Sequence, residues 1–224
     1  MAKSNNNGGG GGGFGAKKAY LVLYNAASAI AWAAVLGRVA VVLGWRGPAF
    51  VPLVVDNFAR ITQTFAVVEI LHALTGVVPA PVFTTLMQVA SRLFLMWAVC
   101  WPFPTLNVST WYSSMLCAWA TTEVIRYTYF VFKQFDAVPG ALHWLRYSAF
   151  LVLYPVGISS EVAMTLKALF GPAPYLASWY PYALMAVLLS YVPGSVILYS
   201  HMLKQRRKYL GGAGKGAEQQ KKKQ

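Results

Sequence analysis

Residues 142–169 read LHWLRYSAFLVLYPVGISSEVAMTLKAL, an apolar run long enough to cross a lipid bilayer as a helix. Inside this run, Tyr154 and Glu161 stand seven positions apart. Seven steps along an α-helix return to nearly the same azimuth, so the two side chains should point the same way, roughly 10 Å apart along the axis. An ionisable group inside a membrane span is costly and marks a functional site by default. This pair is therefore the first candidate for chemistry.

The whole chain has the composition of a polytopic membrane protein, with 57% of its 224 residues hydrophobic, 15% aromatic and only 11% charged. Its formal net charge of +13 is concentrated at the ends, since residues 1–19 carry three lysines and residues 204–224 carry eight basic side chains against one glutamate. Basic ends that flank apolar spans follow the positive-inside rule. No zinc-finger, helix-turn-helix or RNP pattern is present, so nucleic-acid binding is not expected.

Apolar segments of about 20 to 28 residues follow one another from Tyr20 onward, separated by short breaks rich in Gly and Pro. They predict an all-α bundle of about six transmembrane helices, at about 20–43, 52–76, 82–102, 108–134, 142–169 and 177–203. An even number of spans places both termini on one side, and their Lys and Arg residues predict that this side is the cytosol.

This topology divides the chain into three parts. Residues 1–19 are expected to be a disordered Gly-rich cytosolic tail, because they hold too little apolar surface to fold. Residues 20–204 form the membrane catalytic domain, and residues 205–224 form a basic cytosolic tail.

Several charged side chains fall inside the predicted spans. Under the topology above, Arg92 lies near the middle of the membrane, and the cytosolic half holds Glu69, His72, Glu123, Arg126, Lys133 and Arg146. These residues predict either a polar vestibule open to the cytosol or ion pairs that only hold helices together, as Glu123 and Arg126 would at i, i+3. Both interpretations stay open at the level of the sequence.

Three other chemistries lack a complete set of residues. Glu69 and His72 have the Glu-x-x-His spacing of di-iron bundles, but the three histidines are isolated and no second such motif exists, so no metal is expected. Residues 72–79 resemble a tyrosine-phosphatase signature, with Ala73 in place of the nucleophilic cysteine and Pro79 in place of the arginine. No Gly-rich dinucleotide or phosphate loop is present, so no cofactor is expected.

The segment from Tyr154 to Glu161 has the pattern YPxGxxxE. It resembles the catalytic segment of the very-long-chain (3R)-3-hydroxyacyl-CoA dehydratases, membrane lyases of fatty-acid elongation once labelled protein tyrosine phosphatase-like. The resemblance covers about residues 19–205, without the Gly-rich head. Its other pieces are Ala19-Tyr20-Leu21, Tyr24-Asn25, Glu69 to Pro81, Thr84, Gln88, Ser91, Arg92, Trp119, Glu123 to Tyr127, and Leu145-Arg146-Tyr147.

The resemblance implies that Tyr154 and Glu161 are catalytic in removing water from a (3R)-3-hydroxyacyl-CoA to give a trans-2-enoyl-CoA, with their division of acid and base roles open. Gly157 is expected to allow close approach of a ligand or helix. Arg126 and Arg146, with Arg92 as a further candidate, are expected to receive the CoA phosphates. The candidate substrate-binding residues are Arg92, Glu123, Arg126, Tyr127, Arg146, Tyr147, Gly157 and Ser160.

The resemblance also implies a multi-pass protein of the endoplasmic reticulum membrane with both termini in the cytosol. The ending Lys221-Lys222-Lys223-Gln224 fits a dilysine retrieval signal. The expected partners are the long-chain 3-hydroxyacyl-CoA substrate, the lipid bilayer and other enzymes of the elongation system. The alternatives are a catalytically idle membrane scaffold and a small multi-pass transporter, whose inverted repeats are not visible in the sequence.

Overall fold

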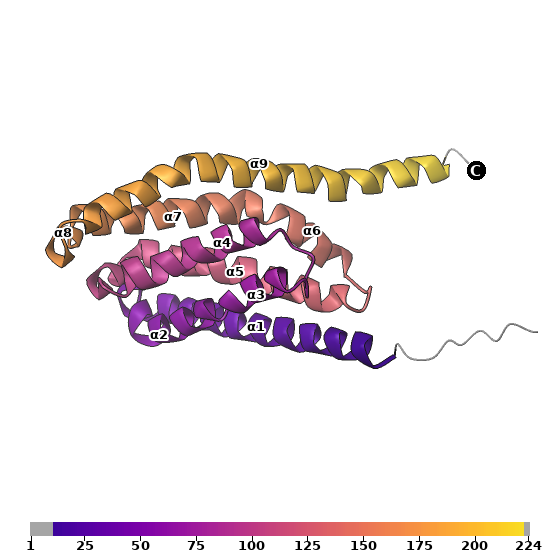
Figure 1. The fold of residues 1–224 in the computed structure, drawn as a ribbon, viewed down its shortest axis with the longest axis horizontal. Helices are drawn as coiled ribbons and strands as arrows, with labels where there is room; N and C mark the ends of the chain where they lie inside the picture. Colours follow the sequence, from indigo (N-terminus) through magenta and orange to yellow (C-terminus); the bar gives the residue numbers. More distant parts are fainter. Residues whose placement is uncertain (1–10, 222–224) are drawn as a thin grey trace, which may run out of the picture.

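The computed structural model describes residues 11–221, with side chains at 15–210, and this part of the chain is helical with no strand (Figure 1). The α-helices are α1 (Gly11–Trp45), α2 (Val51–Thr64), α3 (Val67–Leu74), α4 (Val82–Phe94), α5 (Thr110–Lys133), α6 (Gly140–Ser148), α7 (Phe150–Phe170), α8 (Ala173–Leu176) and α9 (Tyr180–Lys221). The 3₁₀ segments Pro48–Phe50 and Pro104–Val108 and the π-helical segment Leu95–Cys100 connect them.

The predicted all-α membrane bundle is confirmed, but the predicted count of about six spans is not. By length and composition, 4 described segments can cross a membrane: Gly15–Trp45, Val82–Cys100, Gly140–Phe170 and Tyr180–Leu210. The second expected span is divided into α2, of 14 residues, and α3, of 8 residues. Helix α5 has 24 residues, enough to cross, but carries Glu123, Arg126 and Lys133.

The ends of the helices differ from the expected boundaries. Helix α1 begins at Gly11, so residues 11–19 are helical in the structure and not the disordered tail expected there, while residues 1–10 lie outside the described part. Helix α9 continues to Lys221, so no helix end separates the sixth expected span from the basic tail. The start of α1 and the end of α9 lie at the same end of the bundle, here called the terminal end (Figure 1).

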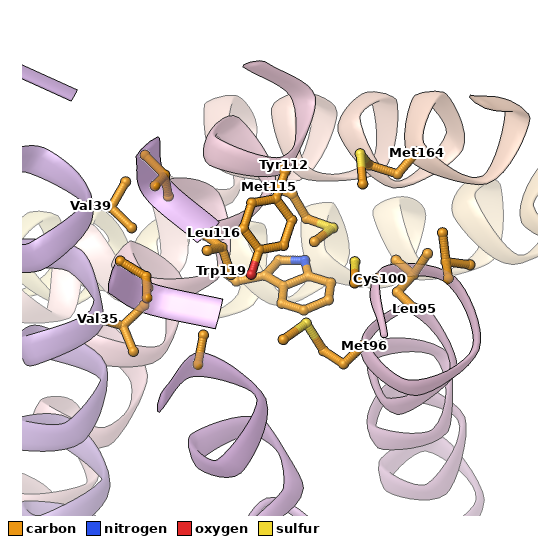
Figure 2. Close-up of a cluster of buried hydrophobic side chains, with 14 of the residues drawn as sticks. Val35, Val39, Leu95, Met96, Cys100, Tyr112, Met115, Leu116, Trp119 and Met164 are labelled. Carbon is orange, nitrogen blue, oxygen red and sulfur yellow. The ribbon is translucent and has the colours of Figure 1, made fainter. Parts of the chain in front are cut away.

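Helix α5 lies in the middle of the bundle, where it packs against α1 on one side and α7 on the other, while α9 covers α6 and α7 (Figure 1). Its buried face carries Tyr112, Met115, Leu116 and Trp119, which meet side chains of α1, α7 and the π-helical segment (Figure 2). In lipid, close packing of such side chains holds helices together, because the hydrophobic effect gives little preference for protein over lipid.

Helix α2 turns its polar residues into the bundle, as its composition predicts. Arg60 is 7% exposed and Gln63 is 2% exposed. The Asp56 carboxylate accepts hydrogen bonds from the Tyr112 hydroxyl at 2.7 Å and from Arg60 at 3.0 Å. The Tyr112 bond joins α5 to α2 at the end of the bundle opposite the terminal end, while the Arg60 bond lies within α2.

The degenerate phosphatase-like stretch, residues 72–79, lies where one helix ends and the chain turns toward the next. Helix α3 ends at Leu74, and the chain then turns toward α4 with Gly76 at φ +68°. That backbone conformation is strained for residues with a Cβ, which explains the glycine. The stretch is a helix end and a turn.

Candidate active site

Glu161 lies on the face of α7 that meets both α5 and α9. Its Oε1 accepts a hydrogen bond from the Trp119 indole nitrogen at 2.7 Å, and its Oε2 accepts one from the Tyr191 hydroxyl at 2.8 Å. Trp119 is only 2% exposed and lies within the buried cluster of Figure 2, so it is a rigid donor. A carboxylate has about four lone-pair sites. Glu161 is therefore fixed in place yet still able to accept a proton from a substrate.

Tyr154 faces the same neighbouring helix. Its hydroxyl donates to the backbone carbonyl of Ser195 on α9 at 3.2 Å, and its ring stacks on Tyr199 with 5.6 Å between the centroids. Tyr154 and Glu161 thus share a face of α7, as the seven-residue spacing predicts. No hydrogen bond joins them within residues 15–210, so the phenol and the carboxylate are separate groups in this conformation.

Residues 142–169 do not form one continuous helix, as the sequence suggests they would. The long apolar run is divided at Ala149 into α6 and α7, whereas Pro155 lies inside α7 without ending it. The break comes before both candidate catalytic residues, so Tyr154 and Glu161 stand on one uninterrupted helix.

Gly157 and Ser160 face α5 on the buried side of α7. A Cβ at Gly157 would lie 3.7 Å from the Ala118 Cβ, and the Ser160 hydroxyl is 2.7 Å from the Ser114 hydroxyl. Ser160 is 1% exposed. In this conformation both predicted substrate-binding residues pack in the contact between α7 and α5. The close approach expected at Gly157 is that of helix α5.

A charge network of Glu69, Arg92, Glu123, Arg126 and Tyr127 joins α3, α4 and α5. The Arg126 guanidinium donates two bonds of 2.7 Å to Glu69 and one of 2.7 Å to Glu123. Arg92 pairs with Glu123, and the Tyr127 hydroxyl donates to Glu69. Two arginines and two glutamates therefore neutralise one another. The sequence leaves two interpretations open. For these residues the structure supports the second, in which ion pairs hold helices together.

The charge network reaches the candidate site through one aromatic ring. The Arg92 guanidinium lies 5.2 Å from the centroid of the Trp119 ring, within the range of a cation–π contact. The Nε1–H of the same indole donates to Glu161. Arg92 therefore lies beside the ring that donates to Glu161, while no ion pair within residues 15–210 joins Arg92 to that carboxylate.

His72 belongs to an aromatic cluster that packs α1 against α3 and α5. Its Nε2 is 2.7 Å from the Tyr20 hydroxyl, and its ring is 4.8 Å from that of Tyr24. The ring of Tyr24 in turn meets Tyr127 at 6.2 Å. Within the described residues, no group of three or more His, Cys, Asp and Glu side chains is placed to hold a metal ion.

Arg146 and Tyr147, the remaining predicted residues, lie on α6 toward the terminal end. The Arg146 guanidinium is 5.8 Å from the centroid of the Phe130 ring, and none of the ion pairs within residues 15–210 includes it. Tyr147 stacks on Tyr209 of α9, with 4.6 Å between ring centroids and 16° between ring planes. No hydrogen bond or ion pair within residues 15–210 joins these two residues to the charge network.

Tyr191 is the residue that sequence reasoning missed. Aromatic residues are common at the ends of membrane helices, so one tyrosine in an apolar segment is a weak signal. A stronger signal was present, because Tyr191, Ser195 and Tyr199 recur at every fourth position and so share one face of a helix. This face of α9 meets Tyr154 and Glu161.

Comparison with known proteins identifies a family to which this chain is similar. The family model "Protein tyrosine phosphatase-like protein, PTPLA" matches residues 63–212. A probable very-long-chain (3R)-3-hydroxyacyl-CoA dehydratase of Schizosaccharomyces pombe is 41% identical over 191 residues, covering 84% of this chain and 91% of the relative.

Two further relatives have the same activity in their names. Very-long-chain (3R)-3-hydroxyacyl-CoA dehydratase PASTICCINO 2B of Oryza sativa is 40% identical, over 88% of this chain and 95% of its own length. Very-long-chain (3R)-3-hydroxyacyl-CoA dehydratase 2 of Homo sapiens is 35% identical, over 86% of this chain and 81% of its own length. No solved structure matches the chain significantly.

Proposed function

Because the chain belongs to the protein tyrosine phosphatase-like (PTPLA) family, we infer that it is a very-long-chain (3R)-3-hydroxyacyl-CoA dehydratase, as its relatives are named. The reaction is the lyase step of fatty-acid elongation that converts a 3-hydroxyacyl-CoA to a trans-2-enoyl-CoA. The observation that carries the site assignment is the Glu161 carboxylate, held by two hydrogen-bond donors on the same face of α7 as Tyr154.

Dehydration requires a base for the C2 proton and an acid for the departing C3 hydroxyl. We assign the base to Glu161, which has free lone pairs, and the acid to Tyr154, which carries a transferable proton. The C2–H electron pair forms the C2=C3 bond, and the C3–O bond breaks as the hydroxyl leaves with the Tyr154 proton as water. Glu161 is then protonated and Tyr154 is a phenolate. Transfer of that proton from Glu161 to Tyr154 through the product water restores both groups.

Trp119 and Tyr191 are positioning residues in this mechanism. Each donates to one oxygen of Glu161, so together they set the direction from which a C2–H bond is approached. Side chains that hydrogen-bond to a catalytic group in this way hold it within the narrow range of productive geometries. Tyr191 is also the other phenol at the site, which makes it the competing candidate for the acid.

Replacing the two phenols separately tests this assignment. We expect Tyr154→Phe to lower kcat by about 100-fold or more, the usual contribution of a general acid. We expect Tyr191→Phe to lower it by only about 10-fold, because one hydrogen bond to a charged group is lost. The measurement is enoyl-CoA formation from a long-chain 3-hydroxyacyl-CoA by detergent-purified protein. Tyr199→Phe is the matched control, since it also removes a phenol from this face of α9, and its rate should be unchanged.

Each outcome of that assay has a separate meaning. If Tyr191→Phe loses more activity than Tyr154→Phe, the acid is Tyr191. If the wild-type protein forms no enoyl-CoA from 3-hydroxyacyl-CoA of any long chain length, the inferred activity itself is wrong, and a scaffold or transporter becomes the better description.

The structure describes a multi-pass membrane protein, and we propose that it resides in the endoplasmic reticulum with both termini in the cytosol. The supporting features are the basic ends of the chain and the lysines at 221–223. Its substrate and product are shared with other elongation enzymes, which we propose as partners in the same membrane. Epitope tags at both ends should bind antibody in cells whose plasma membrane alone is permeabilised. A tag that becomes accessible only after the internal membranes are opened contradicts this topology.

A further inference from the structure

Helix α6 and the second half of α9 meet in a seam at the terminal end of the bundle (Figure 1). Arg206 of α9 is half-buried there, and its Nε donates to the Ser148 hydroxyl at 3.3 Å. The neighbouring basic side chains Lys204, Arg207 and Lys208 are exposed. Arg206 is therefore directed inward, against α6, while its neighbours face outward.

The arginines at this seam are not paired with carboxylates of the described residues. Arg146 of α6 is half-buried beside the seam, with its guanidinium 5.8 Å from the centroid of the Phe130 ring of α5. No ion pair of residues 15–210 includes Arg146 or Arg206. In the sequence between Asp136 and Glu218, Glu161 is the one acidic residue, and its carboxylate bonds to Trp119 and Tyr191. An anionic ligand is thus the natural counterpart of these two arginines.

The same seam presents aromatic faces. Tyr147 and Tyr209 stack at 4.6 Å, Tyr209 is 45% exposed, and the His143 ring lies 4.9 Å from that of Tyr147. Stacked aromatic rings beside arginines form the kind of surface on which nucleotide bases and phosphates bind together.

We propose that this seam binds the nucleotide portion of coenzyme A, with Arg146 and Arg206 on the phosphates and the Tyr147–Tyr209 pair against the adenine. The proposal rests on the dehydratase function inferred above. Arg146 on α6 and Glu161 on α7 are 15 residues apart, about 22 Å at the helical rise of 1.5 Å per residue. An extended pantetheine arm between them would bring the thioester to Tyr154 and Glu161 while the nucleotide stays at the terminal end.

This assignment retains Arg146 of the three arginines expected to receive the phosphates, Arg126, Arg146 and Arg92, and it uses Arg206 in place of Arg92 and Arg126. Both of those guanidiniums are already paired with Glu69 or Glu123. A phosphate would have to displace a carboxylate from either of them, whereas no carboxylate within residues 15–210 pairs with Arg146 or Arg206.

The competing explanation is that basic residues at the cytosolic end of a span only set topology and attract anionic lipid. Those effects depend on the number of charges near the membrane and little on which side chain carries them. Arg207→Gln therefore serves as the matched control for Arg206→Gln, because it removes the same charge one position away from an exposed side chain.

The test compares two substrates with the same 3-hydroxyacyl group, one on CoA and one on pantetheine, which lacks the nucleotide. For Arg206→Gln and Arg146→Gln we expect the ratio of kcat/KM for the CoA substrate to that for the pantetheine substrate to fall about 10-fold, through KM. The ratio should stay at the wild-type value in Arg207→Gln. Tyr209→Leu, at a more exposed position, should weaken competitive inhibition by free CoA.

Equal losses on both substrates in Arg206→Gln and Arg146→Gln, or an Arg207→Gln ratio as low as that of Arg206→Gln, would overturn the proposal. So would unchanged inhibition by free CoA in Tyr209→Leu. These outcomes differ from the result expected if the inferred dehydratase activity is wrong. In that case the wild-type protein would turn over neither substrate.

Discussion

Replacing Glu161 by glutamine should lower kcat for dehydration by about 1,000-fold, because the amide cannot take the C2 proton. The loss should leave the fold intact. A glutamine oxygen can still accept from Trp119, and its NH₂ group can donate to the Tyr191 hydroxyl, which is able to accept as well as donate. The measurement is enoyl-CoA formation in detergent, alongside the thermal unfolding midpoint.

Ser159→Ala is the control for this variant. Ser159 lies on the exposed side of the same helix, and within residues 15–210 its hydroxyl bonds only to the Val156 carbonyl of α7. Its rate should equal that of the wild-type protein. A folded Glu161→Gln protein that dehydrates at near the wild-type rate would show that the base lies elsewhere.

Removing the Arg126 guanidinium should have the largest effect on stability. Arg126→Gln leaves the half-buried Glu69 without its cation and the buried Glu123 with Arg92 alone, and breaking a buried pair on one side costs about 3–5 kcal/mol. The measurement is the free energy of unfolding, or the unfolding midpoint in detergent. Lys133→Gln, which removes an exposed charge from the same helix, should change little.

A double variant distinguishes loss of the Glu69–Arg126 ion pair from a general disruption of α5. Glu69→Gln combined with Arg126→Gln should cost less than the sum of the two single changes, because residues in one network are coupled. If Arg126→Gln instead unfolds like the wild-type protein and raises KM for the CoA substrate, Arg126 binds substrate phosphates, as its depth in the predicted topology suggested.

The sequence predicts those features of the fold that depend on local pattern. Apolar runs of membrane-spanning length identify an all-α membrane bundle, and the seven-residue spacing correctly places Tyr154 and Glu161 on one face of α7. The i, i+3 spacing likewise predicts the pair of Glu123 and Arg126, which the structure contains. Each of these predictions needs only the geometry of a single helix.

The features that the sequence does not predict depend on how helices meet. Glu69 and Arg126 are 57 positions apart, and their pairing follows from the packing of α3 against α5. The Trp119 and Tyr191 donors come from two different helices for the same reason. The division of residues 142–169 at Ala149 was also missed, because Pro155 is the expected helix breaker in that run and the chain accommodates it inside α7.

The partners of Glu161 have a consequence for turnover. Asp56, Glu69 and Glu123 each form an ion pair with an arginine that links or orders helices, whereas Glu161 is held within residues 15–210 by an indole and a phenol, both uncharged. In the mechanism proposed above, protonation of Glu161 breaks no ion pair within residues 15–210 and leaves no arginine there without its counter-charge. The reaction cycle can therefore change the charge of its carboxylate at every turnover while the contacts that hold the bundle together stay as they are.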